Sequence, residues 1–389
     1  MEIPLRGVMQ KNSAELVKLE ERVVGKSCKM KLSICIPTFN RVEQLREILT
    51  CLLPQLEEGM EVVISDNASA DETESMVATY MSQYSCITYH RWPKNMGADR
   101  NYLKVVEQAH GEYCWLFGSD DLVEPGCVRE VLKMLSDGCD IYLFNRMEWH
   151  ENRARVRPRF WLIPTTPCKV FAFSSPDAIS EYLGLATSVG AIFSYLSSIV
   201  VRRGAWLSVP YDDRYTGTAY SHAAILLSMI NGGCRLHYDP RQLVKCKMGD
   251  DSFAKNGTFK RITLDLDGYG MIRDEVFYSR PYAQLAINRI LCVEYKWWQL
   301  ASSMLSLSDE EWRIVRGKLN KIGYPRKLLL YADILGGYKW IIQLLRLLYK
   351  VWMITLDMQE LFFAWLRRCV ARRGPAADKR VTVDATTHT

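Results

Sequence analysis

Residues 113–121 read YCWLFGSDD, an apolar run that ends in a glycine, a serine and two adjacent aspartates. Short apolar runs bounded by turn residues are typical of buried β-strands, and polar side chains that directly follow them lie at one edge of a sheet. Neighbouring carboxylates repel each other unless a positive group binds them. Asp120 and Asp121 therefore predict either a divalent cation site or an exposed turn in which an aspartate caps the next helix.

The same alternation of strand and helix extends to both sides of this segment. We expect strands at residues 32–36, 61–65, 87–90, 113–117 and 141–145, and helices at 42–53, 71–84, 99–109 and 124–135. This rhythm predicts an α/β fold with a mostly parallel sheet and helices on both faces. Ligands of such sheets bind beyond the carboxyl ends of the strands, where the polar clusters of this chain lie.

Two further polar clusters follow other expected strands. Asp66, in residues 65–69 (SDNAS), suits a hydrogen bond to a base or a ribose, but it equally suits a turn that caps the next helix. In residues 95–101 (NMGADRN), Gly97 at a helix start and Arg100 suit an anion, but an ordinary loop and helix cap would look the same. Each cluster alone leaves both interpretations open.

Four motifs in this order resemble those of the family 2 glycosyltransferases. They are residues 36–41 (IPTFNR), the two clusters above and residues 111–121, and the resemblance covers residues 31–145. It implies a Rossmann-like GT-A fold and a nucleotide diphosphate sugar donor. Gly118 departs from the family pattern, because an aspartate often stands at its position.

The resemblance also implies roles for individual residues. Asp66 is expected to bind the base and Arg100 to support the nucleotide. Asp120 would approach the ribose and the donor sugar, and Asp121 would hold a divalent cation, Mn²⁺ or Mg²⁺, on the diphosphate. The complete set of expected nucleotide-sugar-binding residues is Pro37, Thr38, Asn40, Asp66, Asn67, Gly97, Arg100 and Asp120.

The catalytic base is expected near the start of a later helix, where inverting members of the family carry an acidic residue. The corresponding stretch, residues 212–224, places His222 there, and a histidine can act as a general base at neutral pH. The run around His222 also resembles the abequosyltransferase-like branch of O-antigen glycosyltransferases. Asp212 and Asp213 are rival bases, and a helix-capping or core role for His222 is the alternative.

The rest of the chain is expected to be less regular and then helical. Residues 146–210 contain five prolines and are expected to be irregular apart from a strand at 192–201. A helix at 218–231 is expected to precede a strand at 236–247. We expect an extension (1–29), a GT-A domain (30–255, with a nucleotide half 30–145 and an acceptor half 146–255), a helical region (256–373) and a flexible tail (374–389). His237 is expected in a strand, with a structural role.

The net charge of +6 is concentrated near the carboxyl end. Residues 339–373 contain seven basic and two acidic residues, which form a charged stripe beside large apolar residues. Such a helix suits an anionic membrane surface, or else packs as a hairpin on the catalytic domain or on a second copy in a homo-oligomer. Nucleic-acid binding is not expected, because this basic excess lies on an apolar-rich segment.

Compartment and function follow from these features. The twelve cysteines are scattered without a CxxC pair, and residues 1–30 contain no apolar signal segment, so we expect core cysteines in a cytoplasmic protein peripheral to the membrane. We expect an inverting glycosyltransferase with a lipid-linked glycan acceptor, in O-antigen or surface polysaccharide assembly. The alternatives are a non-catalytic nucleotide-sugar-binding scaffold and a sugar nucleotidyltransferase.

Overall fold

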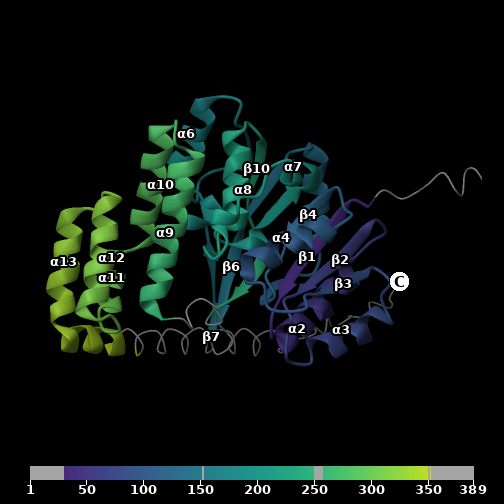
Figure 1. Ribbon diagram of the computed structural model, residues 1–389, viewed down its shortest axis with the longest axis horizontal. Helices are drawn as coiled ribbons and strands as arrows, with labels where there is room; N and C mark the ends of the chain where they lie inside the picture. Colours follow the sequence, from purple (N-terminus) through teal and green to yellow (C-terminus); the bar gives the residue numbers. More distant parts are fainter. Residues whose placement is uncertain (1–29, 151–152, 249–256, 349–350, 352–389) are drawn as a thin grey trace, which may run out of the picture.

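The computed structural model describes residues 30–150, 153–248, 257–348 and 351. The predicted extension (1–29), the flexible tail (374–389) and most of the basic stripe lie outside these residues. Within them, a large sheet forms one half of the molecule and a block of helices the other (Figure 1).

The sheet has ten strands in the order β3-β2-β1-β4-β9-β6-β10-β5, with β7 paired to β6 and β8 to β10. Strands β1, β2, β3 and β4 are parallel to one another, as are β6 and β10, whereas β9 runs antiparallel between β4 and β6. The strands are β1 (Leu32–Thr38), β2 (Met60–Asp66), β3 (Ile87–Arg91), β4 (Tyr113–Leu116), β5 (Asp121–Val123), β6 (Ile141–His150), β7 (Arg153–Arg159), β8 (Lys169–Ala172), β9 (Ile199–Arg202) and β10 (Arg235–Lys247).

Helices cover both faces of this sheet, as predicted. They are α2 (Val42–Leu52), α3 (Thr73–Met81), α4 (Ala98–Gln108), α5 (Cys127–Met134), α6 (Pro176–Leu185), α7 (Arg203–Leu207), α8 (Ser221–Asn231), α9 (Thr258–Val276), α10 (Pro281–Glu294), α11 (Trp297–Ser303), α12 (Asp309–Lys321) and α13 (Arg326–Gly337). Short 3₁₀ turns are η1 (Leu53–Gln55), η2 (Leu135–Asp137), η3 (Val189–Ile192), η4 (Leu196–Ser198) and η5 (Asp213–Tyr215).

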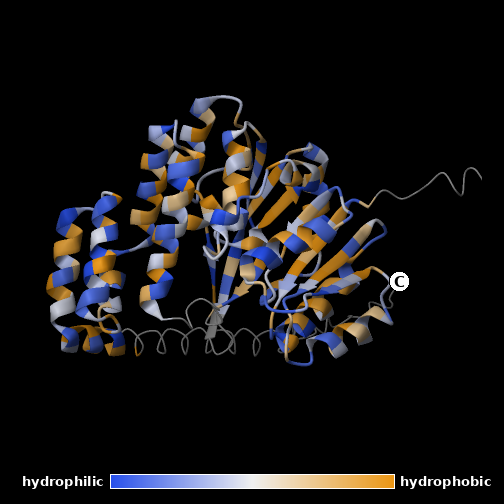
Figure 2. Cartoon of the chain, viewed as in Figure 1, coloured by the Kyte–Doolittle hydropathy of each residue, from blue (hydrophilic) through white to orange (hydrophobic). Residues whose placement is uncertain are grey.

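Strand β1 shows why the sheet lies in the centre. All seven of its residues are buried, because hydrophobic cores cover both of its faces. Ile34 and Ile36 face one core, to which α2, α3 and α5 contribute, and Cys35 faces the other, with α4, α6 and α8. Figure 2 shows the central strands as predominantly hydrophobic.

The helical region shares the second of these cores. Ile262 and Leu266 of α9 and Ile287 of α10 are buried in the same cluster as Leu226 of α8. A buried carboxylate strengthens this contact, because Asp265 of α9 accepts hydrogen bonds from residues at the start of α8 and the end of α10. Helices are therefore confirmed in the described part of the predicted helical region, from Thr258 onward, and they pack directly against the sheet domain.

Two predictions about the middle of the chain are wrong. The expected strand at 192–201 is replaced by η3, η4 and the short strand β9, because Phe193 adopts a left-handed backbone conformation (φ 67°) that interrupts an extended run. Residues 146–210 are also more regular than expected, since β7, β8, α6 and α7 fall within them. Their prolines stand where the chain tolerates them, such as Pro176 in the first turn of α6.

Helix α13 is followed by one further described helix, Lys339–Leu348. No single helix in the described part of the chain is long and apolar enough to cross a membrane. Helix α13 and the helix Lys339–Leu348 reach the length and apolar character of a membrane span only when taken together, and the pair is bent by 92°. Arg346 ties the second helix to α11, because its Nε donates to Ser302 Oγ at 2.6 Å.

The described cysteines are all free thiols, and the prediction that they are core residues holds for only part of them. Four are buried and five are partly buried, but Cys168 is exposed. Its surroundings are described below, since they differ from those of the other cysteines.

Candidate functional site

A reversal of the strand order marks the position of the candidate site. The chain leaves β1 toward β2 on one side, and β4 lies on the other side of β1. Ligands of open α/β sheets bind in the crevice at such a switch point, beyond the carboxyl ends of the strands. The loops after β1, β2 and β4 contain the clusters predicted from the sequence.

The loop after β2 is held in place by Asp66, which is completely buried. Its Oδ1 accepts hydrogen bonds from the backbone N and the Oγ of Ser69, and its Oδ2 accepts one from the hydroxyl of Tyr89 at 2.6 Å. Burial and the Asp66 carboxylate raise the pKa of Tyr89 well above its usual range, so this hydroxyl remains a donor. Asp66 therefore organises its own loop, and any base would share its oxygens with these protein donors.

Asn67 joins this loop to the one before α4. Its Nδ2 donates to Asn95 Oδ1 at 2.9 Å, and its Oδ1 accepts from the backbone N of Met96 at 2.8 Å. Gly97 has a φ of 85°, a conformation that strains any residue with a side chain, and its N donates to Asn95. The second and third predicted clusters are thus in direct contact.

The loop after β1 joins the same assembly. Asn40 adopts a φ of 51°, its N donates to Ser69 Oγ, and its Oδ1 accepts from the N of Ala70 at 2.7 Å. Thr38 is buried, and its Oγ1 has no hydrogen-bond partner among the described residues. Pro37 lies just before it, paired with Ser65 in the ladder between β1 and β2. A buried hydroxyl without a partner at the end of β1 is a position where a bound ligand would supply one.

The two adjacent aspartates after β4 lie in different environments. Asp120 is partly exposed and forms an ion pair with Arg41, with 2.5 Å between Oδ2 and Nη1. Asp121 is buried, and its Oδ2 accepts a hydrogen bond from Ser197 Oγ at 2.5 Å. Burial and the charge of Asp120 raise the pKa of Asp121 to about 7, although Ser197, Tyr195 and Arg146 act against this shift.

This donor set fits a hard divalent cation. Carboxylate oxygens are the ligands that Mg²⁺ and Mn²⁺ prefer, and a cation beside Asp121 would offset the cost of its buried charge. Arg146, whose guanidinium carbon lies 4.3 Å from the centre of the Tyr195 ring, is a further positive charge near this carboxylate. No sequence motif indicates Arg146, Tyr195 or Ser197, because they come from β6 and from the segment before β9.

Gly118 has a steric explanation. A Cβ built on it would lie 2.8 Å from Asp121 Oδ2, closer than real Cβ atoms approach, and would make a tight contact of 3.2 Å with Asp120 Oδ1. The Gly118 N also donates to Ser197 Oγ, which in turn bonds to Asp121. The departure from the family pattern therefore leaves room for the two carboxylates that follow.

Asp99 connects the nucleotide half to the expected base region, a role that no sequence motif predicts. It is buried in α4, where its Oδ2 accepts from the backbone N of Gly217 and of Ala219, at 2.8 and 3.0 Å. Its Oδ1 accepts from the N and the Oγ of Ser221 at the start of α8. Four donors on one carboxylate hold the loop 217–221 against α4, next to Arg100.

The three candidate bases differ sharply in exposure. Asp213 is 74% exposed at its side chain, and its Oδ1 lies 2.9 Å from a guanidinium nitrogen of Arg100. Asp212 is bound by Arg214, whose hydrogen bonds lower the pKa of the carboxyl. His222 is 2% exposed, and its Nε2 is 2.8 Å from the carbonyl oxygen of Phe193.

The environment of His222 is apolar and aromatic. Tyr102 meets its ring edge-on, with the ring centres 5.7 Å apart. Burial lowers the pKa of His222 to about 4, so the imidazole is neutral at pH 7 and its conjugate acid is strong. Its Nδ1 has no hydrogen-bond partner within the described part of the chain. Of the three candidates, Asp213 is the one that lies open to solvent beside a predicted nucleotide-binding residue.

A groove of about 420 Å³ lies beside the loop that Asp99 holds. Gly217 and Thr218 form one wall, and Lys260, Leu264 and Asp267 of α9 contribute to the other. The helical region thus supplies part of a surface that reaches the expected base region.

Comparisons with known proteins agree with this geometry. The sequence model of the family described as Glycosyl transferase family 2 matches residues 33–186. A curated relative, Abequosyltransferase RfbV of Salmonella typhimurium, is 36% identical over 290 residues, which cover 72% of this chain and 86% of the relative. Another, the GalNAc(5)-diNAcBac-PP-undecaprenol beta-1,3-glucosyltransferase of Campylobacter jejuni, is 28% identical over 109 residues, which cover 28% of this chain and 35% of that protein.

Solved structures show the same fold at lower sequence identity. The crystal structure of S. aureus TarS 1-349 in complex with UDP-GlcNAc matches with a TM-score of 0.55 and 14% identity, over 82% of this chain and 92% of that chain. This likeness concerns the fold, whereas the sequence comparisons concern the family. The chain is therefore a glycosyltransferase with a GT-A-like fold that belongs to glycosyl transferase family 2.

Proposed function

We propose that this protein transfers a sugar from a nucleotide diphosphate sugar to an acceptor hydroxyl, with inversion at the anomeric carbon. The observation that carries the proposal is the pair of carboxylates at the switch point of the sheet. Asp121 is buried beside Asp120, in an arrangement that a cation-bound diphosphate would stabilise. The likeness of the chain to an abequosyltransferase supports a sugar donor.

The donor would lie across the loops after β1, β2 and β4. The Thr38 hydroxyl, which lacks a described partner, and the backbone of Asn40 would face the nucleotide, and Asp66 and Asn67 would shape the base pocket. Arg100 and the free backbone N–H groups after Gly97 suit the negative charge of the phosphates. Pro37, directly before Thr38, would line the same pocket, as expected from the sequence.

Asp121 would hold the divalent cation, with Asp120 nearby. When bound, the cation supplies positive charge that stabilises the departing diphosphate. The protein's own residues position the carboxylates, since Ser197 binds Asp121 and Arg41 binds Asp120. This division leaves Asp120 able to approach the ribose and the sugar.

The base would remove the proton of the acceptor hydroxyl. The acceptor oxygen then bonds to the anomeric carbon from the face opposite the diphosphate, and the bond to the diphosphate breaks with its electron pair on the leaving group. We favour Asp213 as the base, ahead of His222 and Asp212, because it is exposed beside Arg100. His222 would then stabilise the start of α8 from within the core.

The acceptor would be a lipid-linked glycan of O-antigen or surface polysaccharide assembly. The Campylobacter relative is named for a glycan linked to PP-undecaprenol, and the groove beside Gly217 leads from the base region toward α9. A lipid-linked acceptor fits a cytoplasmic enzyme that lies on the inner face of the cell membrane.

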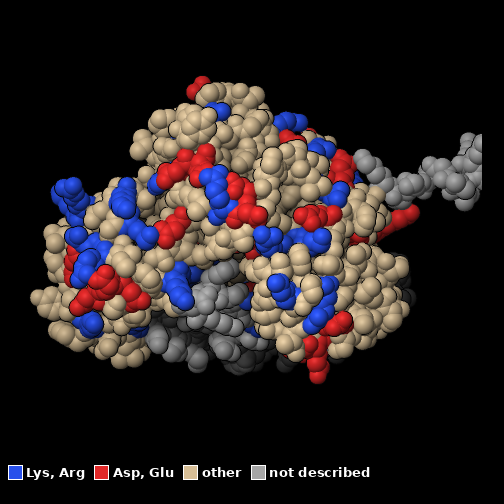
Figure 3. All heavy atoms as spheres, in the orientation of Figure 1, with Lys and Arg blue, Asp and Glu red and all other residues tan. Residues whose placement is uncertain are grey.

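Exposed apolar side chains support such a surface. Tyr331 and Ile334 of α13 and Trp340 and Leu344 of the helix Lys339–Leu348 are between 46% and 65% exposed. Large exposed apolar side chains on neighbouring helices are typical of membrane or protein contacts. On the face drawn in Figure 3, basic and acidic side chains are interspersed, and no broad basic surface suited to nucleic acid is visible there.

A donor screen tests the proposal. The full chain is heated with Mn²⁺ and a panel of nucleoside diphosphates and nucleotide sugars, and a rise in Tm specific to one nucleotide identifies the donor class. Asp121→Asn should reduce the Mn²⁺-dependent part of that rise. If no member of the panel raises Tm, with or without Mn²⁺, the proposed donor site is wrong.

The base is tested separately by three variants. Asp213→Asn should reduce turnover by a factor of about 10² or more and leave the donor-induced rise in Tm unchanged. Asp212→Asn is the matched control, because the carboxylate of Asp212 is adjacent in sequence to Asp213 but is bound by Arg214. If His222→Gln binds donor normally and alone loses turnover, His222 is the base.

A further inference from the structure

A second group of metal-ligating side chains lies far from the proposed donor site. Cys168, His237 and Asp239 each offer one ligand atom, and these atoms lie within 4.8 Å of one another. His237 stands near the start of β10, whereas Cys246, near its end, is paired with Asp121. The group is therefore at the opposite edge of the sheet from the paired aspartates.

The register of the sheet explains why these residues meet. His237 and Asp239 are two residues apart on β10, so their side chains point to the same face. Strand β8 runs antiparallel to β10 and pairs Lys169 with Tyr238. Cys168, one residue before Lys169, therefore stands opposite Asp239 and on the same face as both other ligands.

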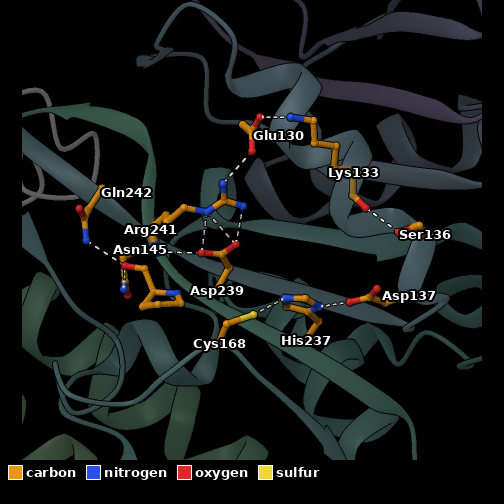
Figure 4. A network of polar contacts seen from close by, with 11 residues as sticks. Glu130, Lys133, Ser136, Asp137, Asn145, Cys168, His237, Asp239, Arg241 and Gln242 are labelled. Carbon is orange, nitrogen blue, oxygen red and sulfur yellow. Dashed lines mark hydrogen bonds and ion pairs between the residues drawn. The ribbon is translucent and has the colours of Figure 1, made fainter.

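His237 is oriented for metal binding by a carboxylate behind it. Its Nδ1 lies 2.7 Å from Asp137 Oδ2, and its Nε2 lies 3.1 Å from Cys168 Sγ (Figure 4). With the Nδ1 proton donated to Asp137, the lone pair of Nε2 points toward the sulfur. A carboxylate on the second nitrogen of a histidine is the usual support of a metal-ligating imidazole. His237 itself is buried, so this orientation is held by packing as well.

The charges around the cluster favour a cation over a reactive thiolate. The carboxylates of Asp239 and Asp137 both lie near the Cys168 thiol, Asp239 within the cluster and Asp137 behind His237. Asp239 is bound by Arg241, which also reaches Glu130 at 2.8 Å. One guanidinium thus faces two carboxylates, and a divalent cation would add the positive charge that a thiolate here requires.

We propose that Cys168, His237 and Asp239 bind a thiophilic divalent transition metal, with Zn²⁺ as the best fit, and that Asp137 is the positioning residue for His237. Sulfur, imidazole nitrogen and carboxylate oxygen are the donors that Zn²⁺ takes in proteins. This site is independent of the cation proposed at Asp121, which would have oxygen ligands.

The geometry needs only a small adjustment. Around a tetrahedral Zn²⁺, the sulfur and nitrogen ligands are about 3.5 Å apart, given bonds of about 2.3 and 2.0 Å. Because Cys168 is exposed, a rotation of its side chain can lengthen the present 3.1 Å to that value, and water can take the fourth position. Asp239 would share its oxygens with Arg241. Binding releases the thiol proton and links the start of β8 to β10.

Cobalt spectroscopy of the full chain tests the proposal. The protein is freed of metal with a chelator, the chelator is removed, and Co²⁺ is titrated while the near-ultraviolet thiolate-to-cobalt absorption band is recorded. We expect one equivalent of Co²⁺ to produce the band, and Zn²⁺ to displace it. Cys168→Ser should abolish the band. Cys86→Ser, at a partly buried cysteine, and Cys246→Ser, beside Asp121, should retain the band.

A second variant tests the positioning role. Asp137→Asn should weaken Co²⁺ binding by a factor of about 10 to 100, while the band remains at saturation. Unchanged affinity in Asp137→Asn would overturn the role of Asp137. A wild-type protein without a thiolate band, or a Cys168→Ser protein that keeps it, would overturn the site. Tm values of all variants, measured without metal, show whether each is folded.

Discussion

Removal of the buried charge at Asp121 should stabilise the metal-free protein at alkaline pH. The pKa of this carboxyl rises from 3.8 to about 7 through burial and the neighbouring Asp120. Between these pH values the folded state binds more protons than the unfolded state, so the free energy of unfolding falls as the pH rises. Asp121→Asn removes this dependence, because an amide does not ionise.

The magnitude follows from the change in pKa. Each pH unit corresponds to about 1.4 kcal/mol, so the ionised carboxylate costs the folded protein up to about 4 kcal/mol above pH 7. Well below pH 3.8, the carboxyl is protonated in both states and this cost disappears. The gain in Asp121→Asn should therefore be largest at pH 8 and small at pH 4.5. The hydrogen bond from Ser197 has the same acceptor in an amide oxygen, so its loss is not expected to offset the gain.

The assay is urea unfolding of wild type and Asp121→Asn at pH 4.5 and 8.0 with a chelator present. Glu58→Gln, at an exposed carboxylate, is the control and should change stability little at either pH. Addition of Mn²⁺ at pH 8.0 should narrow the difference, because a cation at 100 times its Kd stabilises the wild type by about 2.7 kcal/mol. An Asn variant that is no more stable than wild type at pH 8.0 without metal would refute the reasoning.

Three further outcomes are expected. Gly118→Ala should lower Tm and abolish Mn²⁺ binding, because its Cβ would lie 2.8 Å from a buried carboxylate oxygen. Gly184→Ala is the control: its Cβ would have no atom within 4 Å, so Mn²⁺ binding should be unchanged and Tm unchanged or slightly higher. Asp99→Ala should destabilise the protein by about 2–4 kcal/mol and reduce turnover, since it leaves four donors of the loop 217–221 without their acceptor. Equal urea midpoints for this variant and the wild type would contradict this. Ile334→Ser with Trp340→Ser should reduce co-sedimentation with anionic vesicles several-fold, without a change in donor binding, if these exposed side chains contact lipid.

The sheet and its polar edge could be predicted from local sequence. The apolar runs of β1, β2 and β4 are nearly continuous because parallel strands are buried on both faces, and the polar residues follow immediately where the strands end. The sequence alone therefore predicts Asp66, Gly97 and Asp121 at the edge of the sheet where the parallel strands end. Such patterns are set by residues close together in the chain, which is why they can be read without tertiary structure.

The environment of each group depended on residues distant in sequence. Nothing near Asp121 predicts its burial or its bond to Ser197, 76 residues later in the chain. His222 has the position of a base in the sequence, but packing against Phe193 and Tyr102 encloses its ring. Exposure and pKa result from everything that surrounds a side chain, so they follow from packing rather than from motif.

The cluster at Cys168 shows the same division. The sequence predicts His237 in a strand, and this strand is confirmed. Cys168 lies 69 residues earlier, and the sequence pattern does not distinguish it from a core cysteine. Only the antiparallel register of β8 on β10 brings its sulfur to the imidazole. Residue order along the chain thus determines which strands and loops form, whereas the pairing of strands far apart in the chain decides which side chains meet, because hydrogen-bond register and burial are properties of the whole sheet.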